Sequence, residues 1–362
     1  MKPLNMEYGI HTIELYASAV PYEQSQQIIE ALLARNAFYK MRETEQLYED
    51  RYGVDRTYRS DIFSSNGIRF YIEQKFESFC GIRFVTNPST LCSGTHRGLA
   101  LYQPKKDAHV LDCLKWFLCG RMFSLHMEDL FHLEPQKLSL SRIDLTTNLH
   151  FPKGTDLTEI IRLFRQGKTP DQFHRDTLDK SVDRQHILRV KAGKIQFTAY
   201  DKLYDLERKG KIDAPVDSEV LRLELTLGRK AYRKKLHLTG NETFDEVVCL
   251  AYQNVIPLVR KFLRRIFPNS GEHLPYQKAQ KAIMKQIHDP LLREQMLFLL
   301  ERISRNTFRE AAEEAFRSRY IAPSYHPLEA VYVAFDQINV NPATFRKDSK
   351  CGALESFRTL LE

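Results

Sequence analysis

The chain has 362 residues, 43% of them hydrophobic and 28% charged, and its 54 Lys and Arg against 46 Asp and Glu give a formal net charge of +8. This composition is typical of a globular protein of about two or three domains, and it excludes collagen-like and largely disordered chains. The sequence has no stretch of about 18 apolar residues and no secretion signal, so we expect neither a membrane span nor export. Its cysteines are scattered, without a Cys-x-x-Cys pair, and this favours reduced thiols in the cytoplasm.

The first predicted element is a strand over residues 9–16, where polar and apolar side chains alternate. Residues 22–34 have the apolar spacing of a helix, and residues 67–72 and 81–86 are expected to form a pair of strands. An amphipathic helix over residues 110–123 carries the only tryptophan, Trp116. Packing in the core is the expected role of this side chain.

The middle of the chain begins with a predicted strand over residues 138–148 and a helix from Asp156, whose side chain can cap it while Glu159 completes a capping box. Strands over 193–202 and 220–227 follow, and then a long helix over 242–266, bent near Pro257. From residue 269 onward the pattern is helical almost throughout. The predicted fold class is therefore α+β, an antiparallel sheet backed by helices and followed by a mostly helical C-terminal region.

Three of the predicted strands each place polar side chains on one face and apolar side chains on the other, because residues two apart share a face. The polar faces are Arg142, Asp144 and Thr146 on the first, Gln196, Thr198, Tyr200 and Lys202 on the second, and Arg222, Glu224 and Thr226 on the third. If these strands are neighbours in one sheet, a single surface displays Asp144, Glu224, Tyr200 and Lys202.

This set of side chains has a definite chemical use. Two carboxylates on neighbouring strands can hold a hard divalent cation, which polarises a phosphodiester. A tyrosine beside the cation can attack phosphorus and form a covalent phosphotyrosine, and Lys202 can favour the phenolate or neutralise the phosphate. The alternative is an ordinary polar outer face of a sheet, with cross-strand ion pairs such as Arg142–Glu224 and Arg222–Asp144.

The positive charge is concentrated in one part of the chain. Residues 184–267 contain 18 Lys and Arg against 10 Asp and Glu, an excess of eight that equals the whole net charge. This segment includes two basic clusters, Arg229, Lys230, Arg233, Lys234 and Lys235 in the first and Arg260, Lys261, Arg264 and Arg265 in the second. The clusters indicate a surface for the phosphate backbone of DNA, with solvated helix faces as the alternative.

Three short motifs follow one another in a recognisable order: Ser141-Arg142-Ile143-Asp144, then Ala199-Tyr200-Asp201-Lys202, then Arg222-Leu223-Glu224. Together with residues 82–89, they resemble the rolling-circle replication initiators of filamentous phages, the gene II/X family. More distantly, they resemble the initiators of small Gram-positive plasmids. The resemblance covers about residues 65–265.

Such initiators nick one strand at an origin, stay attached to the 5′ end through a tyrosine, and use Mg²⁺ or Mn²⁺. The resemblance implies a role for six side chains: Tyr200 as nucleophile, Lys202 as supporting base or charge, Asp144 and Glu224 as metal ligands, and Arg142 and Arg222 as groups that orient carboxylates or phosphate. Many rolling-circle enzymes also carry a His-x-His pair on the central strand, but this sequence has none.

Two further residues near the motifs have open roles. His150 lies just beyond the first strand, where it is a candidate metal ligand or a solvated loop histidine. Tyr204 lies four residues after Tyr200, a spacing that lets two tyrosines alternate in some initiators. Since the chain is expected to have left the strand by that point, packing is the favoured role of Tyr204.

The change to a helical pattern after residue 269 places a domain boundary there. We expect a replication-initiator nuclease region at 1–268, divisible into sub-lobes 1–135 and 136–268, and a helical C-terminal domain at 269–362. The predicted function is to nick and rejoin DNA, starting rolling-circle replication of a phage or plasmid. The alternatives are a relaxase of a conjugative element and a non-catalytic DNA-binding protein on the same fold.

The expected partners are single-stranded and supercoiled origin DNA. Because the chain has no ATPase motif, a host helicase is also expected. The C-terminal domain would bind the origin, form a homodimer, or be an ordinary helical appendage.

Overall fold

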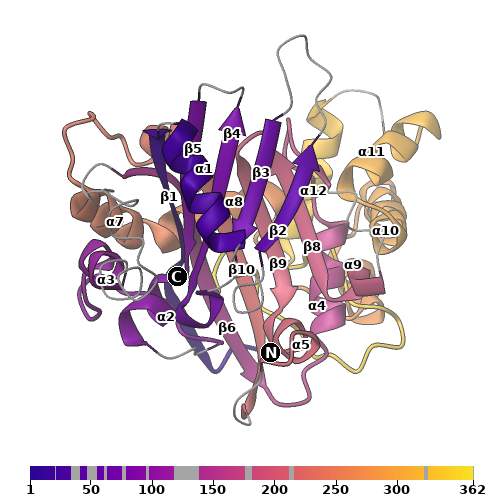
Figure 1. Ribbon diagram of the computed structural model, residues 1–362. Helices are drawn as coiled ribbons and strands as arrows, with labels where there is room; N and C mark the ends of the chain where they lie inside the picture. Colours follow the sequence, from indigo (N-terminus) through magenta and orange to yellow (C-terminus); the bar gives the residue numbers. More distant parts are fainter. Residues whose placement is uncertain are drawn as a thin grey trace. The chain divides into compact units, whose positions relative to one another are not determined.

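The described strands form a ten-stranded sheet (Figure 1). The computed structural model describes residues 1–20, 22–33, 41–46, 55–60, 63–75, 79–94, 98–117, 138–175, 182–211, 216–321 and 325–361. Its strands are β1 (Asn5–Val20), β2 (Met41–Gln46), β3 (Asp55–Ser60), β4 (Ile68–Lys75), β5 (Phe79–Thr86), β6 (Ser139–Pro152), β7 (His174–Arg175), β8 (Ile187–Ala192), β9 (Ile195–Asp201) and β10 (Ser218–Gly228). Their order across the sheet is β2-β3-β4-β5-β1-β6-β10-β9-β8-β7.

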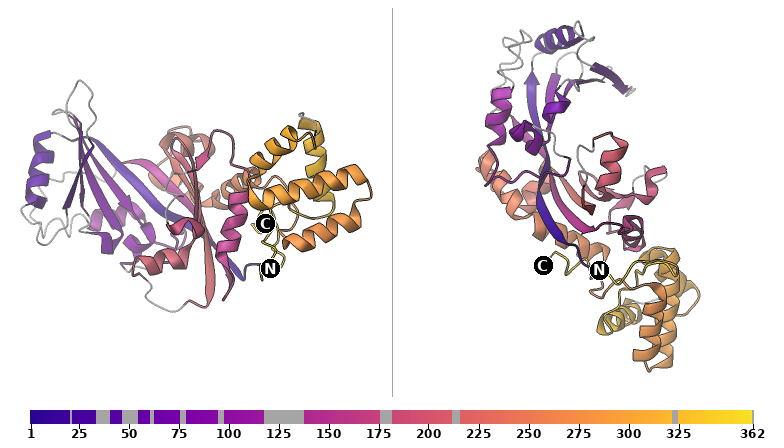
Figure 2. Two further views of the ribbon diagram at one scale, coloured as in Figure 1. Left: turned by 90° about the vertical axis from the view of Figure 1, so that its right-hand side faces the viewer. Right: turned by 90° about the horizontal axis from the view of Figure 1, so that it is seen from below.

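The α-helices of the described residues fall before, between and after these strands. They are α1 (Tyr22–Leu33), α2 (Pro88–Ser93), α3 (Val110–Phe117), α4 (Leu157–Gln166), α5 (Lys202–Arg208), α6 (Arg229–Lys235), α7 (Phe244–Gln253), α8 (Val255–Ile266), α9 (Tyr276–Gln286), α10 (Pro290–Arg305), α11 (Phe308–Arg317) and α12 (Tyr325–Gln337). The strand pairs with described register are all antiparallel. The predicted α+β class is confirmed, including the helical C-terminal region (Figure 2).

The chain divides into two compact units. Unit 1 consists of Met1–Tyr8, Thr147–Leu225 and Ile256–Glu362, and unit 2 of Gly9–Thr146 and Thr226–Val255. In unit 2, β1, β5 and β4 bring Leu15, Phe84 and Phe70 into line across the sheet, and all three are buried. Phe63 stacks on Phe70 and meets Phe117 of α3 edge to face, with the ring centroids of Phe63 and Phe117 4.9 Å apart.

The expected core role of Trp116 is wrong, because its side chain is 76% exposed. Helix α3 buries Val110, Leu114 and Phe117, which share one face at helical spacing. Trp116 precedes Phe117 by one residue and therefore points about 100° away from that face. The predicted continuation of this helix to residue 123 lies outside the described residues.

In unit 1, an aromatic cluster covers one face of β9. Phe197 of β9 stacks on Phe262 of α8 and on Phe164 of α4, with ring centroids 4.7 and 6.2 Å apart. Side chains alternate along a strand, so Tyr200 points to the other face of β9. Helices α4 and α8 thus cover the face opposite to that of Tyr200.

Local signals explain where the helices begin and end. Asp156 caps α4 as predicted and accepts hydrogen bonds from the backbone of Thr158 and Glu159. The predicted capping box is wrong, because the Glu159 carboxylate instead forms ion pairs with Arg162 and Arg346.

The single helix expected over residues 242–266 is two helices, α7 and α8, joined at Asn254. The Asn254 side chain donates to the carbonyl of Leu250 at 2.9 Å and closes the end of α7. Pro257 does not bend a helix. It lies in the first turn of α8, where a missing N–H costs no hydrogen bond.

Among the described residues, no helix is both long and apolar enough to cross a bilayer. Cys92, Cys113, Cys249 and Cys351 are not in disulfide bonds.

His273 is a buried histidine within the aromatic cluster of unit 1, in contact with Phe267 and Phe357. Burial lowers the pKa of its imidazole from 6.5 to about 4, although a hydrogen bond with the Ala343 carbonyl opposes this shift. Between these pH values the unfolded chain takes up a proton that the folded chain does not, so stability falls as the pH falls.

We expect His273 to make the protein about 3 kcal/mol less stable at pH 4 than at pH 7. Urea unfolding across this range should show that loss in the wild type and a shallower pH dependence in His273→Asn, which keeps a donor for Ala343 but does not titrate. Equal pH slopes in both proteins would contradict this assignment.

Candidate active site

The sheet brings together the three strands whose polar faces the sequence singles out. Strand β10 lies between β6 and β9. Asp144 of β6 and Glu224 of β10 therefore lie on neighbouring strands, and Tyr200 of β9 lies one strand further along. Lys202 differs from the prediction, because β9 ends at Asp201 and Lys202 is the first residue of α5.

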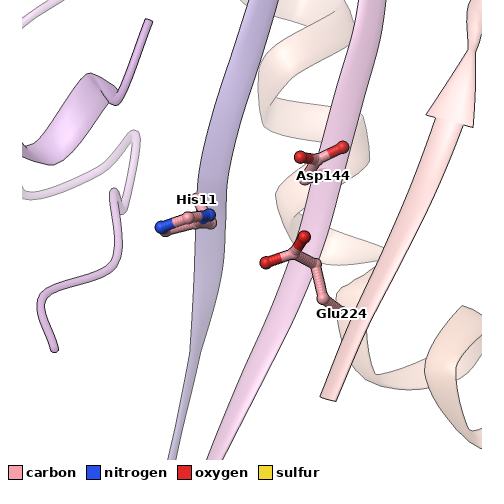
Figure 3. A group of neighbouring side chains, drawn as sticks. All are labelled: His11, Asp144 and Glu224. Atoms are coloured by element: carbon pink, nitrogen blue, oxygen red, sulfur yellow. The ribbon is translucent and has the colours of Figure 1, made fainter. Parts of the chain in front are cut away.

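A histidine joins the two carboxylates. His11 of β1, Asp144 of β6 and Glu224 of β10 each offer a ligand atom, and these three atoms lie within 4.8 Å of one another. Figure 3 shows the three side chains converging from their strands. His11 is not among the residues predicted from the sequence, because a histidine in a predicted strand does not indicate which strand lies beside β6.

Neighbouring contacts hold β1 and β6 in place. The hydroxyls of Ser139 and Ser141 donate to the carbonyls of Tyr16 and Glu14, both at 3.1 Å, and fix β6 beside β1. Two residues before His11, a Cβ on Gly9 would lie 2.6 Å from the carbonyl oxygen of Tyr102. Glycine at this position lets residue 102 pair with Ile10 through two hydrogen bonds of 3.0 Å.

Asp144 is 1% exposed and is oriented by Arg142 of the same strand. Arg142 donates from Nε to Oδ1 at 2.8 Å and from Nη2 to Oδ2 at 2.6 Å, a bidentate pair. Arg142 thus pairs with the carboxylate two residues further along its own strand. Arg222 is fully buried and donates from Nε to Oδ1 of Asn148 at 2.7 Å.

The Tyr200 hydroxyl is placed between charges of both signs. Burial raises the pKa of Tyr200 above 10, and the Glu224 carboxylate raises it further, whereas the charge and hydrogen bond of Arg222 lower it. Tyr200 is therefore a protonated phenol at neutral pH, and it needs a base or a cation before it can act as a nucleophile.

Lys202 lies beside Tyr200 and is buried. Its Nζ is 5.8 Å from the centre of the Tyr200 ring and 3.2 Å from Oδ2 of Asp205. Burial and the charge of Arg222 lower the pKa of Lys202 from 10.5 to about 8, against the opposing effect of Asp205. An amine that is partly neutral near pH 8 can accept a proton.

The two residues with open roles, His150 and Tyr204, have partners outside the histidine and carboxylate group. Nδ1 of His150 is 3.0 Å from the Ser218 hydroxyl, and its Nε2 is 3.5 Å from a carboxylate oxygen of Glu7. Tyr204 lies in α5 and stacks on His186, with ring centroids 3.6 Å apart and the planes 6° apart. This stacking agrees with a packing role for Tyr204.

The two basic clusters lie on separate helices. In α6, Arg229, Lys230 and Lys234 are exposed, and Arg233 and Lys235 are half-buried. In α8, Lys261, Arg264 and Arg265 are exposed, whereas half-buried Arg260 donates to the Leu361 carbonyl. Since α8 packs on the face of β9 opposite to Tyr200, its basic residues do not lie on the face that carries Tyr200.

No family model matches the sequence, and no curated protein sequence matches it. A rolling-circle replication initiator protein from Geobacillus stearothermophilus is a similar solved structure. The match has a TM-score of 0.34 and 10% sequence identity, and it covers 72% of this chain and 86% of that chain. So remote a likeness does not transfer a function.

Proposed function

We propose that the protein is a metal-dependent DNA-nicking and strand-transfer enzyme that uses Tyr200 as its nucleophile to start rolling-circle replication of a phage or plasmid. The observation that carries the proposal is the convergence of His11, Asp144 and Glu224 on three strands, together with half-buried Tyr200, whose pKa the Glu224 carboxylate raises. A purely structural polar face has no need to gather two carboxylates and an imidazole within 4.8 Å.

These three side chains fit a divalent cation. Ligands around a Mg²⁺ or Mn²⁺ ion lie at about 2.0–2.2 Å, so donor atoms within 4.8 Å of one another can reach one ion with small side-chain movements. Two carboxylates suit either metal, and the imidazole favours Mn²⁺ over Mg²⁺. When bound, the ion would polarise the phosphodiester and stabilise the charge that develops on its oxygens.

The chain's own groups then supply the transesterification. Lys202 accepts the phenolic proton of Tyr200 as the phenolic oxygen bonds to phosphorus and the bond from phosphorus to the 3′ oxygen breaks. The leaving 3′ oxygen takes a proton from water and becomes a free 3′ hydroxyl, and the 5′ phosphate remains on Tyr200. The reverse reaction rejoins the strand, so no ATP is consumed. Arg222 holds the tyrosine by its hydrogen bond.

The DNA contacts and other partners of the site are part of the same proposal. The exposed lysines and arginine of α6, Arg229, Lys230 and Lys234, would bind phosphates of the substrate strand. We further propose a host helicase as the source of unwound DNA and the cytoplasm as the place of action.

A covalent adduct is the direct test. The full chain is incubated with Mn²⁺ and a pool of single-stranded oligonucleotides of random sequence, denatured in detergent, and digested for mass spectrometry. We expect a nucleotide attached to the peptide that contains Tyr200, and none when EDTA replaces Mn²⁺. An adduct on another residue would assign the role of nucleophile to that residue. If an adduct forms neither with the random pool nor with supercoiled DNA of the source element, the proposed mechanism is contradicted.

The rate of adduct formation should depend on pH through Lys202. Because burial lowers the pKa of Lys202 to about 8, the neutral amine becomes available above this pH, and the rate should rise with a midpoint near 8. In Lys202→Met the rise should vanish, and the rate at high pH should fall about 10²-fold or more. An unchanged pH profile in the variant would assign the base to another group.

A further inference from the structure

Helix α9 has an exposed face that is basic and contains no acidic residue. Its sequence, YQKAQKAIMKQ, buries Tyr276, Ala279 and Ile283 against the rest of the C-terminal region. The exposed side chains are Gln277, Lys278, Gln280, Lys281, Met284, Lys285 and Gln286. The helix is 11 residues long, which corresponds to about 16 Å.

The neighbouring helices α10 and α11 differ, because Arg302, Arg305 and Arg309 are paired with carboxylates. Arg302 of α10 pairs with Glu314 of α11 at 3.2 Å, and Arg309 pairs with Glu313 within α11 at 2.8 Å. In the part of the chain that the structure describes, no carboxylate forms an ion pair with Lys278, Lys281 or Lys285. The positive charge on α9 is therefore open to an external anion.

A surface hollow of about 550 Å³ lies along this face. It is lined by Gln277, Gln280, Lys281, Met284, Lys285 and Lys347. Lys347 comes from a loop far along the chain, and its Nζ lies 4.9 Å above the ring of Tyr276. The loop thus adds a fourth lysine to the surface of the helix.

We propose that α9 binds duplex DNA, lying in the major groove with its lysines on the flanking phosphates. A major groove about 12 Å wide admits an α-helix, and a glutamine side chain can bond to both N6 and N7 of adenine. Gln277, Gln280 and Met284 share one side of α9 at helical spacing, so two amides and an apolar group would meet successive base edges.

Duplex DNA fits this face better than a protein partner does. Protein interfaces are anchored by large apolar and aromatic side chains, whereas Met284 is the one exposed apolar side chain of α9. This binding surface is separate from the Tyr200 chemistry, so it can be tested whether or not the chain nicks DNA.

The test selects, with the full chain, the best-bound members of a pool of duplexes that have a randomised central segment. The lysine variant K281Q/K285Q should weaken binding to all duplexes and reduce the slope of log affinity against log salt by about 2. The glutamine variant Q277A/Q280A should keep the affinity for random duplex but lose about tenfold or more of the sequence preference.

The matched control is R309Q/R317Q on α11, which removes the same charge from a face that also carries acidic residues, and it should leave duplex binding unchanged. Unaltered binding by K281Q/K285Q, or an equal loss in the control, would overturn the proposal. So would poly-glutamate competing as well as duplex DNA, since that result would indicate an acidic protein partner. Both α9 variants should still form the Tyr200 adduct on single-stranded DNA, which separates this surface from the active site.

Discussion

Replacing Tyr200 with Phe should abolish covalent attachment of DNA and lower the nicking rate by more than about 10³-fold, because it removes the attacking oxygen and little else. The ring remains to pack at the end of β9. Nicking of a labelled single strand and the adduct can be measured in one reaction by denaturing gel electrophoresis. The folded state should persist in circular dichroism spectra.

Tyr204→Phe is the matched control, since it removes the same hydroxyl four residues later, in α5. Tyr204 stacks on His186 and should keep this contact as Phe, so adduct formation should stay near the wild-type level. An adduct lost in Tyr204→Phe and kept in Tyr200→Phe would reverse the assignment. Loss in both variants would show that the two tyrosines act together.

Replacing Glu224 with Gln should weaken Mn²⁺ binding by at least about 100-fold and reduce nicking accordingly, because the loss of an outer-shell partner already costs 10–100-fold. The variant is nearly isosteric, and it takes away a negative charge that raises the pKa of Tyr200. Titration calorimetry with Mn²⁺ measures the binding, and the metal concentration dependence of nicking measures its consequence.

Two histidine variants distinguish the ligand that the structure indicates from the one that the sequence suggested. His11→Gln should weaken Mn²⁺ binding, whereas His150→Gln should not, since His150 contacts Ser218 and Glu7 instead. Equal Mn²⁺ affinity in wild type and His11→Gln would remove His11 from the site. Equal affinity in wild type and Glu224→Gln would contradict the metal centre as a whole.

The sequence was sufficient to place the two carboxylates and the tyrosine, for a physical reason. Each lies in a strand whose polar and apolar side chains alternate strictly, so the strand and its polar face can be predicted together. The sequence does not show which strands are neighbours, so the prediction assumed that these three strands lie in one sheet. In the structure, β6, β10 and β9 are indeed adjacent.

His11 could not be placed in this way, because alternation within a strand gives its face but not its neighbours. Strand β1 comes first in the chain but lies between β5 and β6 in the sheet. The same limit applies to α8, whose basic residues looked close to Tyr200 in the sequence. The contact of Phe262 with Phe197, which assigns α8 to the opposite face, depends on long-range packing.

The Arg142–Asp144 pair has a consequence for how the protein would acquire the proposed metal. A buried carboxylate without a counter-charge would oppose folding, but Arg142 supplies one from the same strand. The sheet can therefore assemble first and take up its cation afterwards. The ion would then be an exchangeable cofactor whose supply in the cell sets activity, and the protein could persist, folded and inactive, when the ion is scarce.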